Sequence, residues 1–145
     1  MRTLEVFVTR PRKLRLYASI VAAALVAVFV VIALFLKDSK TGVYFQTSDQ
    51  VAMVGIGLVL AAAVLWPTWP RVRADDDGVE VRNLLGARRF AWTDVRQLSF
   101  PDKAWWARLE LPGDEYVPML AIQALDGERA VAAMRELRRL HRNAT

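Results

Sequence analysis

Two long apolar runs dominate the first half of the chain. Residues 16–36 form a run of 21 residues without a charged side chain, and residues 51–66 form a second run of 16 residues. At about 1.5 Å per residue, a helix over the first run is about 31 Å long and matches a bilayer core, whereas the second reaches only about 24 Å. The second run therefore needs flanking residues to complete a span. We predict a two-helix transmembrane hairpin over residues 16–69, with residues 37–50 as its linker.

Each run has one other interpretation. The second would also suit a buried helix of a soluble protein, and the first, which follows a basic segment, would suit a secretory signal peptide. The first run is longer than the apolar region of a signal peptide, and no small-x-small cleavage site follows Leu36. An uncleaved membrane anchor therefore fits better.

Side chains within and beside the runs also favour membrane helices. Aromatic residues stand at the ends of the runs, where the bilayer interface would lie: Tyr17, Phe35, Trp66 and Trp69. Small residues recur at four-residue steps that would let two helices approach closely: Ala18 with Ala22, Ser19 with Ala23, and Gly57 with Ala61. Neither run contains an ionisable residue, which argues against an ion path, a proton relay or a transporter.

After Pro70 the pattern changes to short segments in which apolar and polar residues alternate. This period of two is typical of half-buried strands, and Gly, Pro and Asp clusters separate the segments. We predict six antiparallel strands, near residues 71–74, 79–82, 88–92, 95–100, 105–111 and 116–122. Pro118 lies in the last of these, which suggests an edge strand because proline has no N–H to donate.

The last segment is an amphipathic helix. Asp126 is placed as its N-cap, and the helix is expected to end near His141. Its apolar residues recur at three- and four-residue steps and are expected to face the core: Ala130, Val131, Met134, Leu137 and Leu140. The helix would close over the strands, which makes the region from residue 70 onward a small α+β domain.

This order of elements resembles a pleckstrin-homology (PH)-like barrel. More specifically, the chain resembles the small PH-domain membrane proteins of actinobacteria, the type that includes low-molecular-weight protein antigen six. The resemblance extends over roughly residues 12–142 and is carried by the two apolar runs and by three short segments, Arg71-Val72-Arg73, Asp77-Gly78-Val79-Glu80-Val81-Arg82 and Arg89-Phe90-Ala91-Trp92-Thr93-Asp94-Val95. It implies that residues 70–145 form a membrane-tethered PH-like antiparallel barrel with a C-terminal helix. A PH barrel ordinarily has seven strands, one more than the pattern predicts, and the resemblance implies no particular ligand.

The net charge of +5 is concentrated at the N-terminus. Residues 1–15 hold five Lys or Arg and one Glu, a net +4, whereas residues 70–145 hold 13 basic and 12 acidic side chains, a net +1. A nucleic-acid-binding domain needs a basic face on its folded part, so we expect no nucleic-acid partner. The excess of Lys and Arg before the first run predicts that the basic tail, residues 1–15, is cytoplasmic. We therefore expect a multi-pass plasma-membrane protein with both termini in the cytoplasm.

The sequence offers no catalytic, metal or cofactor-binding set. The absence of cysteine excludes disulfides, thiolate zinc sites and cysteine nucleophiles. An EF-hand loop starting at Asp75 would need Gly at its sixth position and Glu at its twelfth, where Glu80 and Gly86 stand instead, so a solvated turn is expected. His141 is the sole histidine and has no acid or nucleophile beside it in the sequence. We predict that the protein is not an enzyme.

Six residues are candidates for contact with a lipid or a partner: Arg71, Arg73, Arg88, Arg89, Trp105 and Trp106. Guanidinium groups bind phosphates in bidentate fashion, but the arginines would equally suit a solvated strand with salt links to Asp75–Asp77. Adjacent strand residues face opposite sides, so one of the paired tryptophans is expected in the core and the other outside. Trp92 is expected in the core.

We therefore expect a non-enzymatic, membrane-anchored PH-like adaptor whose partners are the lipid bilayer and an unidentified protein. Two alternatives remain open at this point. One is a module that senses anionic lipid through the arginines, and the other is an accessory subunit of a larger membrane complex, with the spans as its contact surface.

Overall fold

The computed structural model describes residues 6–38, 42 and 44–145, and the chain divides into two compact units. One unit is the helical hairpin, Arg15–Pro67, and the other joins the segment up to Leu14 with Thr68–Thr145. The domain unit is therefore assembled from two stretches of sequence that lie on either side of the hairpin.

The hairpin consists of α1 (Arg12–Phe35), a short 3-10 turn (Leu36–Asp38), and α2 (Thr47–Leu65), which continues into a second 3-10 turn (Trp66–Thr68). Both helical stretches are long and apolar enough to cross a membrane, with 25 and 22 residues. α2 begins four residues before the predicted apolar run because the Asp49 carboxylate accepts the backbone N–H of Gln46 at 2.8 Å and starts the helix early. The second helical stretch, Thr47–Thr68, thus includes residues on both sides of the apolar run at 51–66 and gains the length that the run alone lacked.

Small residues face the interior of the hairpin. The residues buried within the helices are Ala18, Ala22 and Ala33 of α1 and Gly57 and Ala61 of α2. A Cβ atom on Gly57 would lie 2.7 Å from the Cβ of Phe29, so the helices approach too closely there for any side chain. Two of the three predicted small-residue pairs are therefore buried, whereas Ser19 and Ala23 are exposed.

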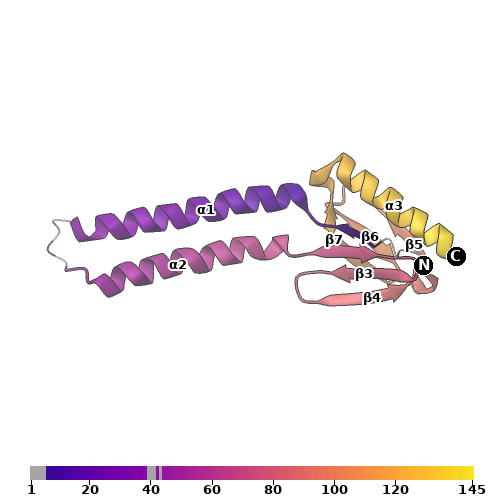
Figure 1. Cartoon of the computed structure of the whole chain (residues 1–145), viewed down its shortest axis with the longest axis horizontal. Helices are drawn as coiled ribbons and strands as arrows, with labels where there is room; N and C mark the ends of the chain where they lie inside the picture. The colour runs from indigo at the N-terminus through magenta and orange to yellow at the C-terminus, as the bar shows by residue number, and fades with distance from the viewer. Residues whose placement is uncertain (1–5, 39–41, 43) are drawn as a thin grey trace. The chain divides into compact units, whose positions relative to one another are not determined.

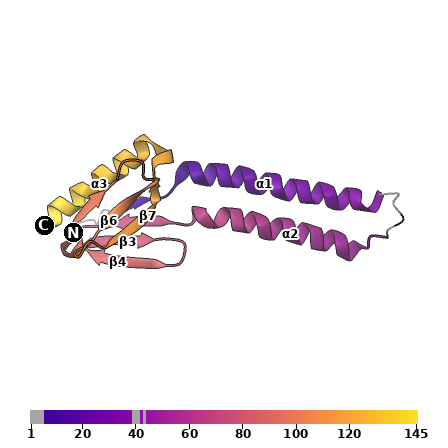
Figure 2. The same ribbon diagram turned by 180° about the vertical axis from the view of Figure 1, so that it is seen from behind.

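The domain contains two antiparallel sheets and one long helix (Figure 1). The first sheet has the order β1-β2-β3-β4, and the second the order β5-β6-β7. Their bounds are β1 Phe7–Thr9, β2 Arg71–Ala74, β3 Gly78–Arg82, β4 Ala87–Ala91, β5 Gln97–Ser99, β6 Trp106–Glu110 and β7 Tyr116–Gln123. α3 (Glu128–Ala144) follows and lies beside the second sheet in both views (Figure 2). All six predicted strands are present.

The first strand, β1, was not among the six strands that the sequence predicted. We expected residues 1–15 to be a tail, but Phe7–Thr9 pair antiparallel with β2, and α1 begins at Arg12; residues 1–5 lie outside the described part. Phe7 packs against the domain core while Val8 faces outward. Because the outward-facing Val8 is itself apolar, Phe7–Thr9 show no alternation of apolar and polar residues, and the pattern missed this strand. The helical hairpin is thus inserted between the first and second strands.

The two sheets meet where β2 and β7 lie side by side. Asn83, at the end of β3, links the sheets because its Nδ2 donates to the Pro118 carbonyl at 2.8 Å and its Oδ1 accepts the Leu120 N–H at 3.4 Å. β7 is an edge strand of its sheet, as Pro118 predicted. The side-chain amide of Asn83 therefore supplies hydrogen bonds between the two sheets, where no backbone ladder of the described residues joins them.

One core lies between the sheets and α3. Trp92 is at its centre with 1% of its surface exposed, as predicted, and its Nε1 donates to the Asp75 carbonyl at 2.7 Å. The other large side chains buried almost completely are Leu109, Met119, Ile122, Leu137, Val72, Val79 and Val81.

Two predictions for the C-terminal helix were wrong. Gly127, not Asp126, is the N-cap of α3, and the buried Asp126 carboxylate instead accepts the backbone N–H of Lys13 at 3.0 Å. Val131 is 57% exposed, and Ala133 takes the core position expected for it.

Candidate interaction surfaces

The outer face of the first sheet carries four arginines. Val72, Val79 and Val81 point inward, so the residues between them point outward, which brings Arg71, Arg73 and Arg82 onto one face. Arg89 of β4 joins them because it lies opposite Glu80 in the ladder. The structure thus brings together three of the predicted arginines, and Arg82 completes the set.

Arg89 is held by an acidic turn. Its Nη2 lies 2.9 Å from both carboxylate oxygens of Asp75, and that carboxylate also accepts the backbone N–H groups of Asp77 and Gly78 at 3.0 Å. Burial alone would raise the pKa of Asp75, but these hydrogen bonds outweigh it and hold the pKa below its ordinary value. The salt link to the acidic turn that the sequence suggested for these arginines is therefore present at Arg89.

The other arginines of this face are held less firmly. Arg71 Nη2 lies 3.7 Å from Glu80, and its buried Nε has no hydrogen-bond partner within the described residues. Arg73 is exposed, and no carboxylate of the described residues lies within salt-bridge distance of it. Arg73 is therefore the guanidinium on this face that is best placed to meet a ligand.

Arg88 lies apart from this face. Its guanidinium sits 5.2 Å from the centroid of the Phe90 ring, two residues along the same strand, in a cation–π contact. Alternation places Arg88 and Phe90 on one side of β4 and Arg89 on the other. The predicted arginine set is therefore divided between two sides of the sheet.

The paired tryptophans differ from the prediction, because neither enters the core. Trp105 is 77% exposed and Trp106 is 39% exposed. β6 begins only at Trp106, and a register shift between Trp106 and Ala107 gives the first inward position to Ala107. The carbonyl of Trp105 accepts the N–H of Ala124 at 2.8 Å, which fixes the backbone of this exposed residue beside the turn that leads into α3.

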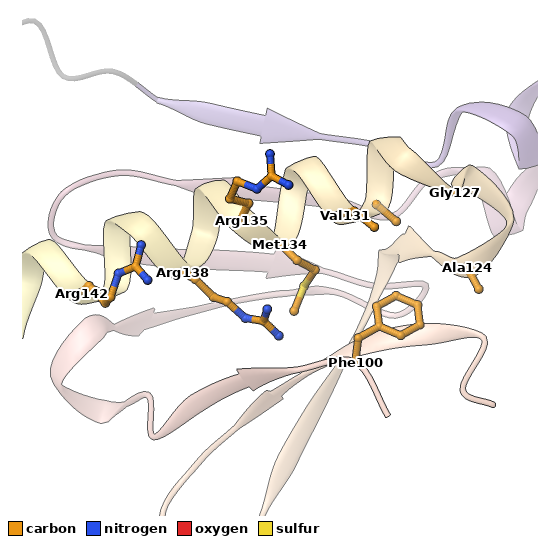
Figure 3. Close-up of a pocket in the computed structure, with 9 residues that line it drawn as sticks. Phe100, Ala124, Gly127, Val131, Met134, Arg135, Arg138 and Arg142 are labelled. Carbon is orange, nitrogen blue, oxygen red and sulfur yellow. The ribbon is translucent and has the colours of Figure 1, made fainter. Parts of the chain in front are cut away.

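That turn borders a cleft along α3 that the sequence did not reveal. Figure 3 shows the side chains that line this cleft. Its volume is about 570 Å³. It is lined by Phe100, Ala124, Gly127, Ala130, Val131, Met134, Arg135, Arg138 and Arg142. Three of its residues are arginines and none is acidic. The one local signal was the spacing of Val131, Arg135, Arg138 and Arg142, which places them on one stripe of a helix.

Polar groups elsewhere in the domain hold the fold together. The Nε2 of His141 lies 2.9 Å from the Val95 carbonyl, and its ring packs on Trp92 with centroids 5.6 Å apart. The Ser99 hydroxyl donates to Glu110 at 2.7 Å, and this bond with a second from Gln97 lowers the pKa of Glu110. Within the described residues, no three His, Asp or Glu side chains are grouped to hold a metal ion.

The four-plus-three arrangement of strands followed by a helix agrees with a comparison against known families. The model of the family described as "Bacterial PH domain" matches residues 69–140. The chain belongs to this family. The match begins just before β2 and ends within α3, so it covers six of the seven strands. In this bacterial PH domain the first strand lies outside the matched segment because the hairpin separates it from the rest.

Curated relatives come from mycobacteria. The chain is 49% identical over 133 residues to Uncharacterized protein Rv1417 of Mycobacterium tuberculosis and to Uncharacterized protein Mb1452 of Mycobacterium bovis. Each alignment covers 92% of this chain and 86% of the relative, so it includes the hairpin as well as most of the domain. The predicted actinobacterial affinity is confirmed. No solved structure matches the chain significantly.

Proposed function

We propose that this chain is a multi-pass plasma-membrane protein whose hairpin spans the bilayer and holds the PH-like domain at the cytoplasmic surface. In this proposal the domain is a non-enzymatic adaptor that presents a binding surface to a protein partner.

The pairing of β1 with β2 carries the proposal. β1 precedes the hairpin and β2 follows it, yet Phe7 lies opposite Ala74 and Thr9 opposite Val72 in one ladder. Two strands can share hydrogen bonds only within one aqueous compartment, because open strand edges do not occur in hydrocarbon. The ladder therefore requires the two helices to leave and return to the same side of any membrane they cross, which supports a hairpin with both termini together.

The exposed surface of the helices supports insertion into lipid. The residues buried in α1 and α2 are alanine and glycine, whereas large apolar side chains such as Leu34, Phe35 and Val59 are 65–70% exposed. In a soluble protein such helices would bury these side chains. A bilayer supplies the apolar solvent that this surface needs, and the absence of ionisable residues from the apolar runs at 16–36 and 51–66 agrees with it.

The distribution of charge supports a cytoplasmic location for the domain. Five Lys or Arg precede the first apolar run and two lie in the linker, so the positive-inside rule favours the termini inside the cell. Two residues on each side separate the helical stretches from the strands: Arg10-Pro11 lie between β1 and α1, and Trp69-Pro70 lie between the second 3-10 turn and β2. A domain tethered this closely keeps a high local concentration at the membrane, so weak partner contacts become effective.

Cysteine labelling of intact cells tests this topology, and the natural chain provides the background because it has no cysteine. Tyr44→Cys marks the hairpin tip and Leu85→Cys the β3–β4 turn, where the native side chains are 96% and 98% exposed. An impermeant maleimide is expected to label only Tyr44→Cys, with Leu85→Cys reacting after permeabilisation. Labelling of Leu85→Cys in intact cells, or of both sites, would overturn the proposed orientation.

A second candidate function is contact with anionic lipid through the outer face of the first sheet, favoured by the exposed guanidinium of Arg73, which has no salt-bridge partner within the described residues. Val8 lies opposite Arg73 in the ladder and is 46% exposed, so a fluorophore on Val8→Cys would report the distance of this face from the bilayer. Quenching by nitroxide-labelled lipid is expected to increase when phosphatidylglycerol is added to phosphatidylcholine nanodiscs. Arg73→Gln should remove the increase. Quenching that does not depend on phosphatidylglycerol would exclude this function.

A further inference from the structure

We propose that the cleft along α3 binds an acidic, amphipathic segment of a partner protein, which inserts apolar side chains between α3 and Phe100 and pairs its carboxylates with the arginine stripe. The proposal deepens the adaptor function, on which it rests, by naming the class of partner and the surface that receives it.

The floor of the cleft is apolar. Phe100 faces Met134 across it (Figure 3). Val131 and Ala130 also line the cleft. Val131 is 57% exposed on a helix whose other apolar residues are mostly buried, so a branched apolar side chain faces water here without a partner. Apolar side chains from a partner would remove this surface from water, which is the main source of affinity in such grooves.

The rim of the cleft is strongly basic. Arg135, Arg138 and Arg142 follow Val131 at steps of four, three and four residues, so they form a stripe along one side of α3. All three are exposed, and no carboxylate of the described residues lies within salt-bridge distance of any of them. By contrast, Arg139 on the neighbouring stripe is paired with Glu136. The cleft thus brings together three arginines that have no ion-pair partner within the described residues.

The dimensions favour a peptide segment. From Gly127 to Arg142 the helix rises about 22 Å, the length of four turns of a partner helix or about seven extended residues. Acidic residues at helical spacing would meet the arginine stripe while the opposite positions enter the floor. Arg138 also donates to the Leu98 carbonyl of β5 at 3.4 Å, so it helps to cover the edge of that strand and is the least free of the three.

A peptide selection tests the proposal on the full chain in phosphatidylcholine nanodiscs. Random 15-residue peptides on phage are selected on the natural chain and counter-selected on the Arg135→Glu/Arg142→Glu variant, which leaves Arg138 in place. The selected peptides are expected to be rich in Asp and Glu interleaved with large apolar residues. Failure to select any peptide that distinguishes the two proteins, or selection of peptides without acidic enrichment, would overturn the proposal.

The best selected peptide is then measured by fluorescence anisotropy. Arg135→Glu/Arg142→Glu is expected to weaken its binding at least tenfold, and Val131→Ser to weaken it severalfold. Arg129→Glu is the matched control because Arg129 lies on α3, is exposed and does not line the cleft, so it should leave the affinity nearly unchanged. Equal weakening by Arg129→Glu would mean that net charge alone attracts the peptide, which contradicts a built site.

Two other occupants have distinct outcomes. If the chain self-associates in nanodiscs and Val131→Ser abolishes this, the cleft binds a second copy, and the proposal is overturned. If phosphatidylglycerol competes with the peptide in an Arg135-dependent way, the arginines bind lipid headgroups, and the proposal is also overturned. None of these measurements depends on which side of a membrane the domain occupies, so their failure is separate from failure of the proposed topology.

Discussion

The carboxylate of Asp126 accepts a hydrogen bond from the backbone N–H of Lys13 at 3.0 Å, although the two residues are 113 positions apart in the sequence. Lys13 is the second residue of α1, where the N–H groups of a helix have no partner within the helix. Asp126 is itself buried, with 8% of its surface exposed. The residue just before α3 therefore caps the first turn of α1, and this turn belongs to the same compact unit as the domain.

Loss of this cap should destabilise the domain. We expect Asp126→Ala to lower the free energy of unfolding by about 1–2 kcal/mol, the usual cost of removing a helix cap. Asp126→Asn keeps an acceptor oxygen and should cost less. The measurement is urea unfolding of the purified chain in micelles, together with hydrogen exchange of the Lys13 amide, which should become faster in Asp126→Ala.

Asp102→Ala is the control for this cap, because Asp102 lies exposed in the turn between β5 and β6. It should change stability by less than about 0.5 kcal/mol. Unchanged exchange of the Lys13 amide in Asp126→Ala would contradict the capping role.

The pair formed by Arg89 and Asp75 should make stability depend on pH in the acidic range. The folded-state pKa of Asp75 lies below its ordinary value of 3.8, so its carboxylate contributes stability above pH 3.8, and this contribution is lost as the pH falls through the folded-state pKa. We expect Arg89→Gln to raise the pKa of Asp75, so that acid unfolding begins at a higher pH. Because half of the Arg89 side chain is exposed, the loss at neutral pH should be at most about 1 kcal/mol.

An NMR titration of the Asp75 carboxyl group measures this directly. Arg88→Gln is the matched control, since Arg88 lies on the same strand but contacts the Phe90 ring rather than a carboxylate. The Arg88→Gln substitution should leave the pKa of Asp75 unchanged. An equal shift in both variants would show that net charge, and not the contact of Arg89 Nη2 with the two carboxylate oxygens, lowers the pKa.

The buried Trp92 and the exposed Trp105 should differ strongly in the stability that truncation costs. Trp92 is buried, and its indole N–H donates to the Asp75 carbonyl. Trp92→Ala should cost about 3–5 kcal/mol, as for other large core residues, whereas Trp105→Ala should cost less than about 0.5 kcal/mol. Thermal unfolding of both variants in micelles checks this; equal losses would contradict the observed positions of the rings.

Particular residues show which features of the fold could be predicted from the sequence. Strands β2 to β7 were predictable because alternating apolar and polar residues between turn signals mark half-buried strands, and the buried Trp92 was predictable with them. β1 was not, because Phe7–Thr9 are three residues beside a basic segment, and their pairing depends on β2, more than 60 positions away. Asp126 stands in the sequence where an N-cap of α3 is expected. In the folded chain its carboxylate instead accepts the backbone N–H of Lys13 in α1.

The α3 cleft lay beyond sequence reasoning for a similar reason. Phe100 and Met134 form it from elements more than 30 residues apart, and only their packing creates the hollow. The exposed position of Trp106 follows from a local shift of register in β6, which leaves no sign in the pattern of apolar residues. Local periodicity thus predicted the elements, whereas the surfaces depend on how the elements meet.

The two glycines of α2 should differ sharply in their tolerance of a side chain. A Cβ atom on Gly57 would lie 2.7 Å from the Cβ of Phe29, whereas nothing lies within 4 Å of a Cβ on Gly55. Gly57→Ala should therefore push the helices apart and lower the melting temperature of the hairpin in micelles. Gly55→Ala should leave it unchanged or raise it slightly, because alanine favours helix over glycine. Circular dichroism at 222 nm distinguishes them, and equal behaviour would contradict the close approach at Gly57.

The first strand provides the last test, because it decides whether the N-terminal segment is part of the folded domain. Phe7 packs against the core, whereas its neighbour Val8 faces outward and is 46% exposed. We expect Phe7→Ala to lower the free energy of unfolding by about 2 kcal/mol, less than for a fully buried phenylalanine, and Val8→Ala by less than about 0.5 kcal/mol. Urea unfolding followed by tryptophan fluorescence measures both. If β1 were a solvated tail, the two variants would be equally stable; a selective loss in Phe7→Ala is what a PH-like domain assembled across an inserted hairpin requires.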